Sequence, residues 1–480
     1  MSKFTKIVAT ISDKRCDIEF IRALYNEGMN VVRMNSAHLD REGFLKIINN
    51  VRAVSENIAL LIDTKGPEVR STVAENDAIE ITANDILKVV GNPALISTHE
   101  CIAVSYPYFV RDLHVGDDIL LDDGEIDLKV ESKTDDYLLC RALNDGVLGS
   151  RKSVNVPGVR INLPSITEKD RNNILFAIEQ DLDFIAHSFV RGKEDLMEIQ
   201  QLLDEHKSPI KIISKIENQE GVDKIEEILE HSYGVMIARG DLGIEVAQEK
   251  IPGIQRRLIR KCVTAKKPVI VATQMLHTMI KNPRPTRAEV TDVANAIYYR
   301  TDALMLSGET AYGKYPVEAV RTMSKIAEEA EKTKLSENDI PVPLETNDIR
   351  SFLSHAAMKA SSKVGTKAVL TDSYTGKTVL NLSAFRGTNP ILASCYTKRL
   401  VRELALSYGV FPTCQYRKKT TKEYFFSQLH ELLKAGTIEI SDYVCYLSGS
   451  FGAGHGTTFL EINQVDKILK EENGYDLPNF

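Results

Sequence analysis

The segment that decides the fold reads IKIISKIENQEGV at residues 210–222, and MIARGDLGIE follows at residues 236–245. The first segment begins as an apolar strand and then presents Lys215 and Glu217, two positions apart. Because residues i and i+2 of a strand point to the same face, this amine and carboxylate leave the strand end together. The second segment is another apolar strand that breaks into Arg239-Gly240-Asp241. These two strand ends predict a site for a divalent cation beside a transferring oxyanion group.

The composition is that of an ordinary soluble protein with several domains. The chain has 480 residues, of which 43% are apolar and 26% charged, and this length indicates roughly three domains. A net charge of −7 and a pI near 5.9 argue against nucleic acid or an acidic membrane as partner. No apolar run is long enough to span a membrane, and the N-terminus lacks the apolar core of a signal peptide. The seven cysteines never show CxxC spacing, which predicts reduced thiols in a cytoplasmic protein.

Eight short apolar runs recur along the first two thirds of the chain, and each is followed by an amphipathic stretch. The runs are Ile7–Ile11, Val31–Met34, Ala59–Ile62, Phe184–Ala186, Ile210–Ile213, Val235–Ala238, Val269–Ala272 and Ala303–Leu306. Most gaps have the length of one strand–helix unit, but the gap from Ile62 to Phe184 is far longer. We therefore expect an α/β protein with a (β/α)8 (TIM) barrel, formed by residues 1–68 and 164–335 and interrupted after its third strand.

The interruption, residues 69–163, shows the alternation of antiparallel strands. Apolar side chains at positions 126, 128 and 130 alternate with Asp127 and Lys129, after a turn marked by Asp123-Gly124. This pattern predicts a small β domain. Because it follows the end of a barrel strand, where loops form the active-site face, we expect a lid over the site.

A third unit follows a polar, proline-bearing linker, ENDIPVPLETND, at residues 337–348. In residues 349–480 we expect a C-terminal α/β domain, because apolar runs again alternate with helical spacing. Its predicted buried strands are Ala368–Thr371, Ile391–Cys395 and Tyr443–Leu447.

Polar residues gather where the predicted barrel strands end. They are Arg33, Asn35, Asp63, Thr64, Lys65, Lys215, Glu217, Asp241, Thr273, Gln274 and Ser307. Any one of them, taken alone, is more simply interpreted as a capped strand end or a surface ion pair. In a barrel, however, the carboxyl ends of all strands converge on one face, so together they predict one pocket.

The charged members of this set have distinct chemical uses. Glu217 and Asp241 offer hard oxygen ligands for magnesium or manganese, and their alternative is a salt bridge to Lys215 or Arg239. Lys215 suits a phosphoryl group or an enolate oxygen, whereas a Schiff base would fit poorly beside a metal ion. Arg33 can donate two parallel hydrogen bonds to a phosphate.

Asn35, Asp63 and Thr64 present neutral and singly charged oxygens. That donor set is more in keeping with a monovalent cation than with magnesium. The alternative for all three is ordinary turn chemistry after a strand.

The segment TDSYTGKT at residues 371–378 ends like a phosphate-binding loop. A Walker A motif would need glycine at position 371, where this chain has threonine, so a P-loop is excluded. Hydroxyls and backbone amides there still suit a sugar phosphate, and a plain strand–helix turn is the alternative. The residues in question are Thr371, Ser373, Thr375, Gly376, Lys377 and Thr378. A later glycine-rich loop with Gly449, Gly452, Gly454 and Gly456 lacks GxGxxG register and is either a second wall of that pocket or a turn.

Taken together, the segments resemble the pyruvate kinase family over nearly the whole chain. The matching runs include GMNVVRMN (28–35), LLIDTKGPEVR (60–70), ISKIENQEG (213–221), IARGDLGIE (237–245), NPRPTRAEVTDVANAI (282–297) and ALMLSGETAYGKYP (303–316). The resemblance implies a (β/α)8 barrel, a β-barrel lid and a C-terminal α/β domain. It also implies a cytoplasmic, homotetrameric, glycolytic enzyme that is in some members allosteric.

The activity implied by the resemblance is transfer of the phosphoryl group of phosphoenolpyruvate to ADP, which gives pyruvate and ATP. Glu217 and Asp241 would hold Mg²⁺ (or Mn²⁺), and a second magnesium would arrive with ADP. Substrate binding and catalysis would fall to Arg33, Lys215, Gly240, Asp241, Thr273 and Ser307. Thr273 and Ser307 would lie near the proton route to the enolate, with the donor left open. The nucleotide would contact Asn35, His38, Arg70 and Lys152, and catalysis would rest on positioning and charge neutralisation.

The chain departs from the family pattern at the implied potassium site, which is formed by Asn35, Asp63 and Thr64. The family commonly has R-x-N-F-S-H where this chain has RMNSAH at 33–38, and the serine replaced by Ala37 normally supplies an oxygen to K⁺. Glu68 is the residue of potassium-requiring members. We therefore expect a K⁺ requirement with weakened affinity. The TGKT loop similarly implies activation by a sugar phosphate as a hypothesis.

Two other functions compete with this reading. A metal-dependent aldolase or lyase acting on pyruvate enolate would also pair magnesium with strand-end carboxylates, but it would need neither Lys152 on a lid nor the DTKGPE segment. A non-catalytic effector-binding protein on the same fold would be expected to have lost Lys215, Glu217 or Asp241, and all three are present.

Overall fold

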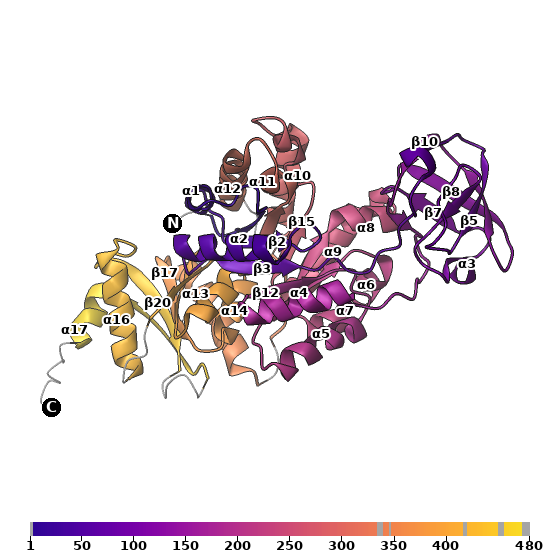
Figure 1. Cartoon of the computed structure of the whole chain (residues 1–480). Coiled ribbons are helices and arrows are strands. Elements are labelled where there is room, and N and C mark those ends of the chain that lie inside the picture. Colours follow the sequence, from indigo (N-terminus) through magenta and orange to yellow (C-terminus); the bar gives the residue numbers. More distant parts are fainter. Residues whose placement is uncertain (1–2, 334–338, 345–346, 416–419, 450–455, 473–480) are drawn as a thin grey trace, which may run out of the picture.

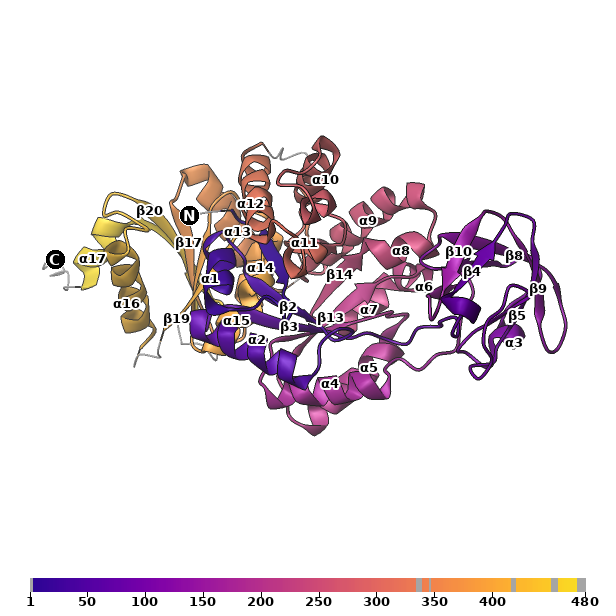
Figure 2. The ribbon, with the colours of Figure 1, turned by 45° about the horizontal axis from the view of Figure 1, so that its top comes forward.

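The computed structural model describes residues 3–333, 339–344, 347–415, 420–449 and 456–472. The chain forms three bodies in a row, with a barrel in the middle (Figures 1 and 2). The inserted domain extends from one side of the barrel, and the C-terminal domain packs on the other side in both views. This arrangement confirms the predicted fold class.

The central body is a closed parallel barrel with strand order β1-β16-β15-β14-β13-β12-β3-β2. Its strands are β1 (Lys6–Thr10), β2 (Val31–Asn35), β3 (Ala59–Asp63), β12 (Phe184–His187), β13 (Lys211–Ile216), β14 (Gly234–Ala238), β15 (Val269–Ala272) and β16 (Ala303–Leu306). Every strand contains most of the apolar run predicted for it. The insertion lies between β3 and β12, as the long gap predicted.

Helices cover the barrel on its outer face. They are α1 (Ile18–Asn26), α2 (Arg41–Val54), α4 (Glu168–Glu179), α5 (Lys193–Glu205), α6 (Gln219–Asp223), α7 (Ile225–His231), α8 (Arg239–Glu245), α9 (Ile251–Thr264), α10 (Arg287–Tyr298), α11 (Gly308–Ala311) and α12 (Pro316–Lys332), with short 3₁₀ turns η2 (Gln248–Lys250) and η3 (His277–Ile280). Local sequence sets their ends. The side chain of Asp17 caps α1, and Gly28 after it has a φ of +105°, which glycine adopts without steric penalty.

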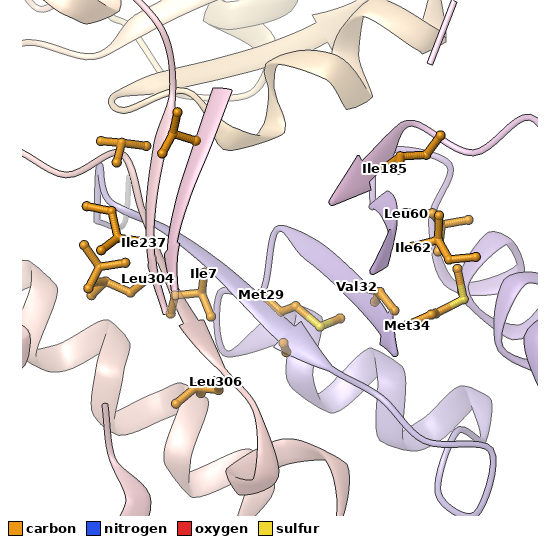
Figure 3. Packing of buried hydrophobic residues seen from close by; sticks show 14 of the residues in the cluster. Ile7, Met29, Val32, Met34, Leu60, Ile62, Ile185, Ile237, Leu304 and Leu306 are labelled. Atoms are coloured by element: carbon orange, nitrogen blue, oxygen red, sulfur yellow. The ribbon is translucent and has the colours of Figure 1, made fainter. Parts of the chain in front are cut away.

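Side-chain alternation gives the barrel two separate cores. Val8, Leu61 and Met236 belong to the cluster inside the barrel, whereas Ile7 and Leu60 belong to the cluster between strands and helices. Figure 3 shows residues of the outer cluster from several strands packing together. The period-2 alternation of buried strands therefore fills both layers.

The inserted domain has its own core and two sheets. Its strands are β4 (Ala78–Ile81), β5 (Ile86–Val90), β6 (Cys101–Ala103), β7 (Asp118–Leu121), β8 (Ile126–Lys133), β9 (Leu138–Ala142), β10 (Gly146–Gly149) and β11 (Val154–Asn155), with η1 (Glu75–Asp77) and α3 (Phe109–Asp112). They form a six-stranded sheet, β11-β7-β8-β9-β5-β6, and a pair, β10-β4. The predicted alternation is confirmed in β8, and the turn before it has positive φ at Asp123 and Gly124.

The C-terminal domain is a five-stranded sheet with order β19-β18-β17-β20-β21. Its elements are α13 (Ile349–Val364), β17 (Ala368–Ser373), α14 (Lys377–Ala384), β18 (Ile391–Cys395), α15 (Lys398–Glu403), η5 (Leu404–Leu406), β19 (Val410–Cys414), α16 (Thr421–Lys434), β20 (Tyr443–Ser448), β21 (Phe459–Gln464) and α17 (Val465–Glu472). The three predicted strands correspond to β17, β18 and β20. β19 and β21 were not predicted from the sequence.

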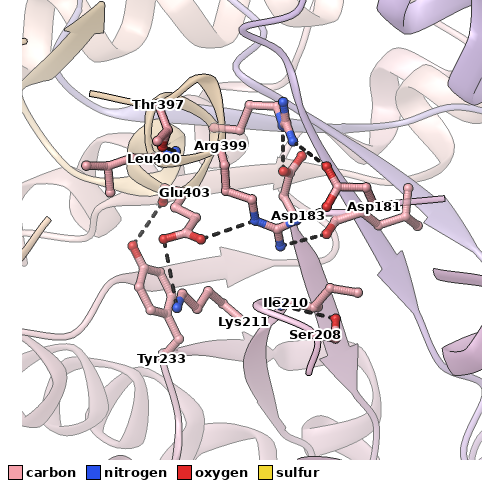
Figure 4. Close-up of polar contacts among 12 residues, drawn as sticks. Asp181, Asp183, Ser208, Ile210, Lys211, Tyr233, Thr397, Arg399, Leu400 and Glu403 are labelled. Carbon is pink, nitrogen blue, oxygen red and sulfur yellow. Dashed lines mark hydrogen bonds and ion pairs between the residues drawn. The ribbon is translucent and has the colours of Figure 1, made fainter. Parts of the chain in front are cut away.

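The C-terminal domain closes the N-terminal end of the barrel. Ala405 and Leu406 of η5 belong to the same cluster as the side chains inside the barrel. Nearby ion pairs join the same two bodies. Arg399 meets Asp181 (Figure 4), and Arg402 meets both Asp181 and Asp183. Apolar burial and paired charges thus hold these two bodies together.

The remaining bulk features are simple. Each of the seven cysteines is a free thiol, and five of them are buried. In the described parts of the chain, no helix has the length and apolar character needed to cross a membrane.

Candidate active site

Lys215 lies at the centre of a buried polar cluster at the carboxyl ends of the barrel strands. Its Nζ is 2.8 Å from Glu217 Oε1 and 3.1 Å from Asp63 Oδ1, and it donates a 2.7 Å hydrogen bond to Ser188 Oγ. The predicted meeting of Lys215 and Glu217 is therefore confirmed, and it takes the form of the salt bridge that was the alternative to metal binding at Glu217. Asp63 and Ser188 reach the same amine from β3 and from the turn after β12.

The charges of this cluster perturb one another strongly. Burial alone would lower the pKa of Lys215, but Asp63, Glu217 and Asp241 outweigh it and raise the pKa above its ordinary value. Burial raises the pKa of Glu217 to about 8, although Lys215 opposes that shift. Lys215 therefore stays charged at neutral pH. Such displaced values are typical of functional sites.

Glu217 and Asp241 are the candidate ligands for a divalent cation. Glu217 Oε2 accepts a 2.7 Å hydrogen bond from the Phe189 amide, whereas the buried Oε1 accepts no hydrogen bond from the described residues and has only the ion pair with Lys215. Asp241, in the first turn of α8, is close enough to shift the pKa of both partners. Two carboxylates with a free oxygen fit a hard cation that keeps water and substrate as further ligands. No set of three or more such ligands occurs within the described ranges.

The alternative salt bridge from Arg239 to Asp241 does not form. Arg239 Nη1 instead pairs with Asp292 at 2.7 Å, and Nη2 donates 2.7 Å to the Thr273 carbonyl. Arg239 thus holds the turn after β15 and leaves Asp241 free of that pairing.

Thr273 occupies a strained backbone position. Its φ is +71° and that of Gln274 is +53°, values that are uncommon for side chains and especially for a β-branched one. The Thr273 hydroxyl donates to the Ala272 carbonyl at 2.6 Å and accepts from the Gly240 amide at 2.8 Å. The two predicted substrate-binding residues Gly240 and Thr273 are therefore in contact with each other.

Arg33 is fixed by the residues around it. Its Nε is 2.6 Å from Asp63 Oδ2, and its Nη1 donates 3.0 Å to Thr10 Oγ1. Burial opposes ionisation of Asp63, but Arg33 and Lys215 outweigh it and lower the pKa of that carboxyl. Asp63 is thus a carboxylate shared between two predicted catalytic cations.

The three candidate potassium ligands are already engaged within the protein. Asp63 has the two cation partners just described, and Asn35 Oδ1 accepts a 3.0 Å hydrogen bond from the Ala37 amide. The Thr64 hydroxyl donates to the Ala186 carbonyl at 3.3 Å. The oxygen chemistry fits a monovalent cation, but that cation would compete for each ligand.

A cleft of about 540 Å³ lies between lid and barrel. It is lined, among others, by Glu68, Arg70, Asp123, Ser153, Asp241 and Glu245. Arg70 and Asp241, predicted on separate domains, are brought to one cleft. Lys215, Glu217, His38 and Lys152 are not among its lining residues.

The predicted nucleotide contacts on the lid are paired with neighbouring acids. Arg70 Nη2 is 2.6 Å from Glu68 Oε2, and Lys152 Nζ is 2.8 Å from Asp122 Oδ2. His38 is exposed, and its amide donates to the Asn35 carbonyl.

The TGKT loop joins β17 to α14. Gly376 has a φ of +78° and caps α14, while its amide donates 2.9 Å to Ser373 Oγ. The Thr378 hydroxyl lies 2.7 Å from the Thr457 hydroxyl, which follows the glycine-rich loop. The loop therefore adjoins that second segment, of which Gly452 and Gly454 lie outside the described residues.

Two buried polar residues near the site, Ser188 and Glu309, were not predicted from the sequence. Ser188 directly follows β12, so the rule that polar residues cluster at strand ends would have found it. Glu309 lies two positions beyond Ser307 and accepts a 2.8 Å hydrogen bond from the Ser307 amide. In the sequence Glu309 looks like any glutamate in a helix, and only its burial in the structure distinguishes it.

Comparison with known proteins gives one family. The family model "Pyruvate kinase, barrel domain" matches residues 2–320, and "Pyruvate kinase, alpha/beta domain" matches residues 352–462. A pyruvate kinase of Borreliella burgdorferi is 45% identical over 98% of this chain and 100% of its own length. One from Bacillus licheniformis is 42% identical over 98% of this chain and 82% of its own length.

A solved structure agrees with these relatives. The crystal structure of a pyruvate kinase from Cryptosporidium parvum superposes with a TM-score of 0.91 at 34% identity, covering 97% of this chain and 96% of that one. The chain is therefore a phosphotransferase and belongs to the pyruvate kinase family.

Proposed function

We propose that this protein transfers the phosphoryl group of phosphoenolpyruvate to ADP, giving pyruvate and ATP. The observation that carries the proposal is the buried Lys215, held charged among Asp63, Glu217 and Ser188 at the active-site end of the barrel. A fixed cation in a low-dielectric site stabilises a phosphoryl group in flight without reorganising first. Lys215 supplies that charge, and Arg33, aligned by Asp63 and Thr10, binds the phosphate.

Glu217 and Asp241 are proposed to hold Mg²⁺ or Mn²⁺. When bound, such an ion would neutralise charge on the substrate carboxylate and phosphate. Glu217 supports this assignment because one of its oxygens is buried and accepts no hydrogen bond from the described residues. A carboxylate with a raised pKa is also one that a metal ion must deprotonate on binding.

We propose that the enolate is protonated from the side of the substrate that faces Thr273 and Ser307. The hydroxyl of Thr273 and the backbone of Gly240 lie in contact, and we assign the substrate carboxylate to this region, with the amide of Asp241. Thr273 and Ser307 follow neighbouring strands, β15 and β16. We propose that these two hydroxyls lie near the route by which a proton reaches the enolate. The group that delivers the proton is left open.

The nucleotide is proposed to bind between lid and barrel. Arg70 lines the cleft there, whereas Asn35, His38 and Lys152 are assigned by family resemblance. Because Arg70 and Lys152 are paired with Glu68 and Asp122, nucleotide phosphates must replace those partners. The assignment therefore involves movement of lid side chains on binding.

We propose that the activity depends on K⁺ and that the potassium site binds K⁺ with lowered affinity. Asn35, Asp63 and Thr64 have the right oxygens, but Ala37 supplies none, and Asp63 already has two cationic partners. Activation by a sugar phosphate at Thr371–Thr378 is a further proposal. It is supported by the adjoining segment at Thr457. The homotetramer and the cytoplasmic location stay predictions.

One assay tests the reaction. The protein is mixed with phosphoenolpyruvate, ADP and Mg²⁺, with and without K⁺, and pyruvate and ATP are followed together. Equal formation of both products, abolished by a metal chelator, is the expected result. Pyruvate and inorganic phosphate without ATP would show hydrolysis of phosphoenolpyruvate and not transfer to ADP, and absence of both products would contradict the proposal. Fructose bisphosphate and hexose monophosphates are then added, and unchanged kinetics would exclude them as activators.

A further inference from the structure

Ser153 is a half-buried serine of the lid, and its hydroxyl is bonded to both the side chain and the backbone of one acid, Asp123. The Ser153 hydroxyl donates a 2.6 Å hydrogen bond to Asp123 Oδ1 and accepts a 2.8 Å hydrogen bond from the Asp123 amide. The carbonyl of Ser153 accepts a further 3.0 Å hydrogen bond from the Asp122 amide. Ser153 therefore fixes the backbone of this turn and the carboxylate of Asp123 together.

The turn that Ser153 holds carries two adjacent acids in an uncommon backbone conformation. The φ angles of Asp122 and Asp123 are +53° and +57°, values that persist in residues other than glycine where the surroundings impose them. The two acids have different partners. The Asp122 carboxylate lies 2.8 Å from Lys152 Nζ, whereas the Asp123 carboxylate is bonded to the Ser153 hydroxyl and forms no ion pair with another described residue.

Ser153 lies between the two lid cations that are proposed to bind the nucleotide. Lys152 precedes it in the sequence, and Arg70 is its partner in an antiparallel β-bridge. Ser153, Asp123 and Arg70 all line the cleft between lid and barrel. A carboxylate at this place that is not held by a hydrogen bond is within the same small region as both cations.

Each of these cations already has one carboxylate that nucleotide phosphates must replace. Arg70 Nη2 is 2.6 Å from Glu68 Oε2, and Lys152 pairs with Asp122. A second carboxylate near either cation would compete with phosphate oxygens, because both are anionic acceptors for the same donors. A hydrogen bond to a charged acceptor is stronger than one between neutral groups, so the Ser153 hydroxyl is well suited to hold Asp123.

We propose that Ser153 is a positioning residue of the nucleotide site, which keeps the carboxylate of Asp123 from competing with the phosphates of ADP. With Asp123 held, Lys152 and Arg70 have one carboxylate competitor each. Without the Ser153 hydroxyl, the Asp123 carboxylate turns to one of these cations. The inference deepens the proposed function and rests on it, because it takes Lys152 and Arg70 as contacts of ADP.

The first test removes the hydroxyl in the full chain. For Ser153→Ala, binding of ADP with Mg²⁺ is measured by calorimetry without phosphoenolpyruvate, and the KM values of both substrates are measured by turnover. We expect the Kd and the KM for ADP to rise roughly two- to fivefold, the size of a competing exposed ion pair. The kcat and the KM for phosphoenolpyruvate should stay unchanged. Ser153→Thr, which keeps a hydroxyl, should bind ADP like the unaltered chain.

A double-mutant cycle decides whether the hydroxyl acts through Asp123. Asp123→Asn removes the competing charge, so this variant should bind ADP at least as tightly as the unaltered chain. Adding Ser153→Ala to Asp123→Asn should then weaken ADP binding no further. Thr134→Ala is the matched control on the lid. The Thr134 hydroxyl likewise accepts hydrogen bonds from nearby amides, those of Asp136 and Tyr137, but it does not line the cleft, and its loss should leave ADP binding unchanged.

The outcomes separate the inference from its basis. Unchanged ADP binding in Ser153→Ala would overturn the inference, and so would an equal loss of ADP affinity with and without the Asp123 carboxylate. The second result would show that Ser153 only maintains the shape of the lid. Lys152→Met is measured in parallel. If it does not weaken ADP binding, the proposed nucleotide contacts on the lid are wrong and the inference falls with them. If the unaltered chain does not bind ADP, the proposed function itself is wrong.

Discussion

Two buried lysines at opposite ends of the barrel have opposite electrostatics. Lys215 lies near the carboxyl end of β13, where Asp63, Glu217 and Asp241 outweigh burial and raise its pKa. Lys6 begins β1, and burial lowers its pKa to about 7, a shift that Lys3 reinforces. The Lys6 ammonium donates to the Val410 carbonyl at 2.5 Å and lies 4.5 Å from the Phe411 ring.

The difference shows what each end of the barrel is built to do. Both lysines are buried, so the placement of carboxylates decides whether a lysine stays charged. At the carboxyl end one of those carboxylates, Asp241, also lines the cleft beside the barrel. At the amino end the lysine meets the C-terminal domain, whose Leu406 closes the barrel interior. Chemistry and stability are therefore assigned to opposite ends of one fold.

The largest expected effect lies at the carboxyl end. Glu217→Gln removes a proposed metal ligand and a partner of Lys215, and we expect kcat to fall roughly 10²–10³-fold, as when one stabilising group of an active site is lost. Mg²⁺ titration followed by ATP formation and by calorimetry measures it. The folded state should persist in far-UV circular dichroism. Unchanged metal affinity would remove Glu217 from the proposed metal site.

The next largest effect lies at the amino end and concerns stability. Arg402 Nε is 2.6 Å from Asp183, which is fully buried. Arg402→Met leaves that acid with the 3.3 Å ion pair to Arg52 and a 2.8 Å hydrogen bond from the Leu60 amide. We expect a loss of about 3 kcal/mol in the free energy of unfolding, the lower end for breaking a buried ion pair.

The exposed pair Arg41–Glu179 provides the control for Arg402. Both its side chains are more than half exposed. Arg41→Met should change the free energy of unfolding by less than about 1 kcal/mol. Guanidinium unfolding of the full chain compares the two variants. Equal changes in the free energy of unfolding would mean that burial of the Arg402–Asp183 ion pair adds nothing to its contribution to stability.

The third prediction uses the pKa of Lys6. The unfolded chain keeps the Lys6 proton up to about pH 10, whereas the folded chain loses it near pH 7, so between these values the unfolded state binds more protons. The contribution of Lys6 to stability therefore rises with pH in that window and is lost as the pH falls towards 7. Lys6→Met should flatten this rise. Melting temperatures of both proteins at pH 7, 8 and 9 test it, and parallel curves would be contrary to the assigned pKa.

The smallest effect concerns K⁺. Ala37→Ser restores the oxygen that the family pattern has at this position, so we expect a few-fold lower K⁺ concentration for half-activation. The shift of melting temperature with added KCl provides a readout without turnover. Full activity of the unaltered chain in the absence of any monovalent cation would exclude a K⁺ requirement.

The barrel was predictable because each of its strands is a short continuous run of apolar residues in the sequence. The same holds for Lys215 and Glu217, whose shared face follows from their spacing and is confirmed by the 2.8 Å separation. β19 and β21 were missed because their burial is partial and Pro412 interrupts the first of them. Local pattern thus locates buried strands and misses exposed edges.

Contacts between distant segments were not predictable from pattern. The pattern predicted Arg33, Asp63 and Lys215 at one end of the barrel, but not that Asp63 pairs with both cations. The role of Leu406 as part of the barrel interior depends on how two domains dock. Glu309 looks like an ordinary acid in a short helix until its burial and its two backbone partners are known.

The most direct test of the account compares Lys215→Met with Lys6→Met in the assay with phosphoenolpyruvate, ADP and Mg²⁺. Both changes remove a buried ammonium from a barrel strand. The account predicts that ATP formation is lost only in Lys215→Met, while Lys6→Met keeps a rate close to that of the unaltered chain. Intact ATP formation in a folded Lys215→Met protein would contradict the account.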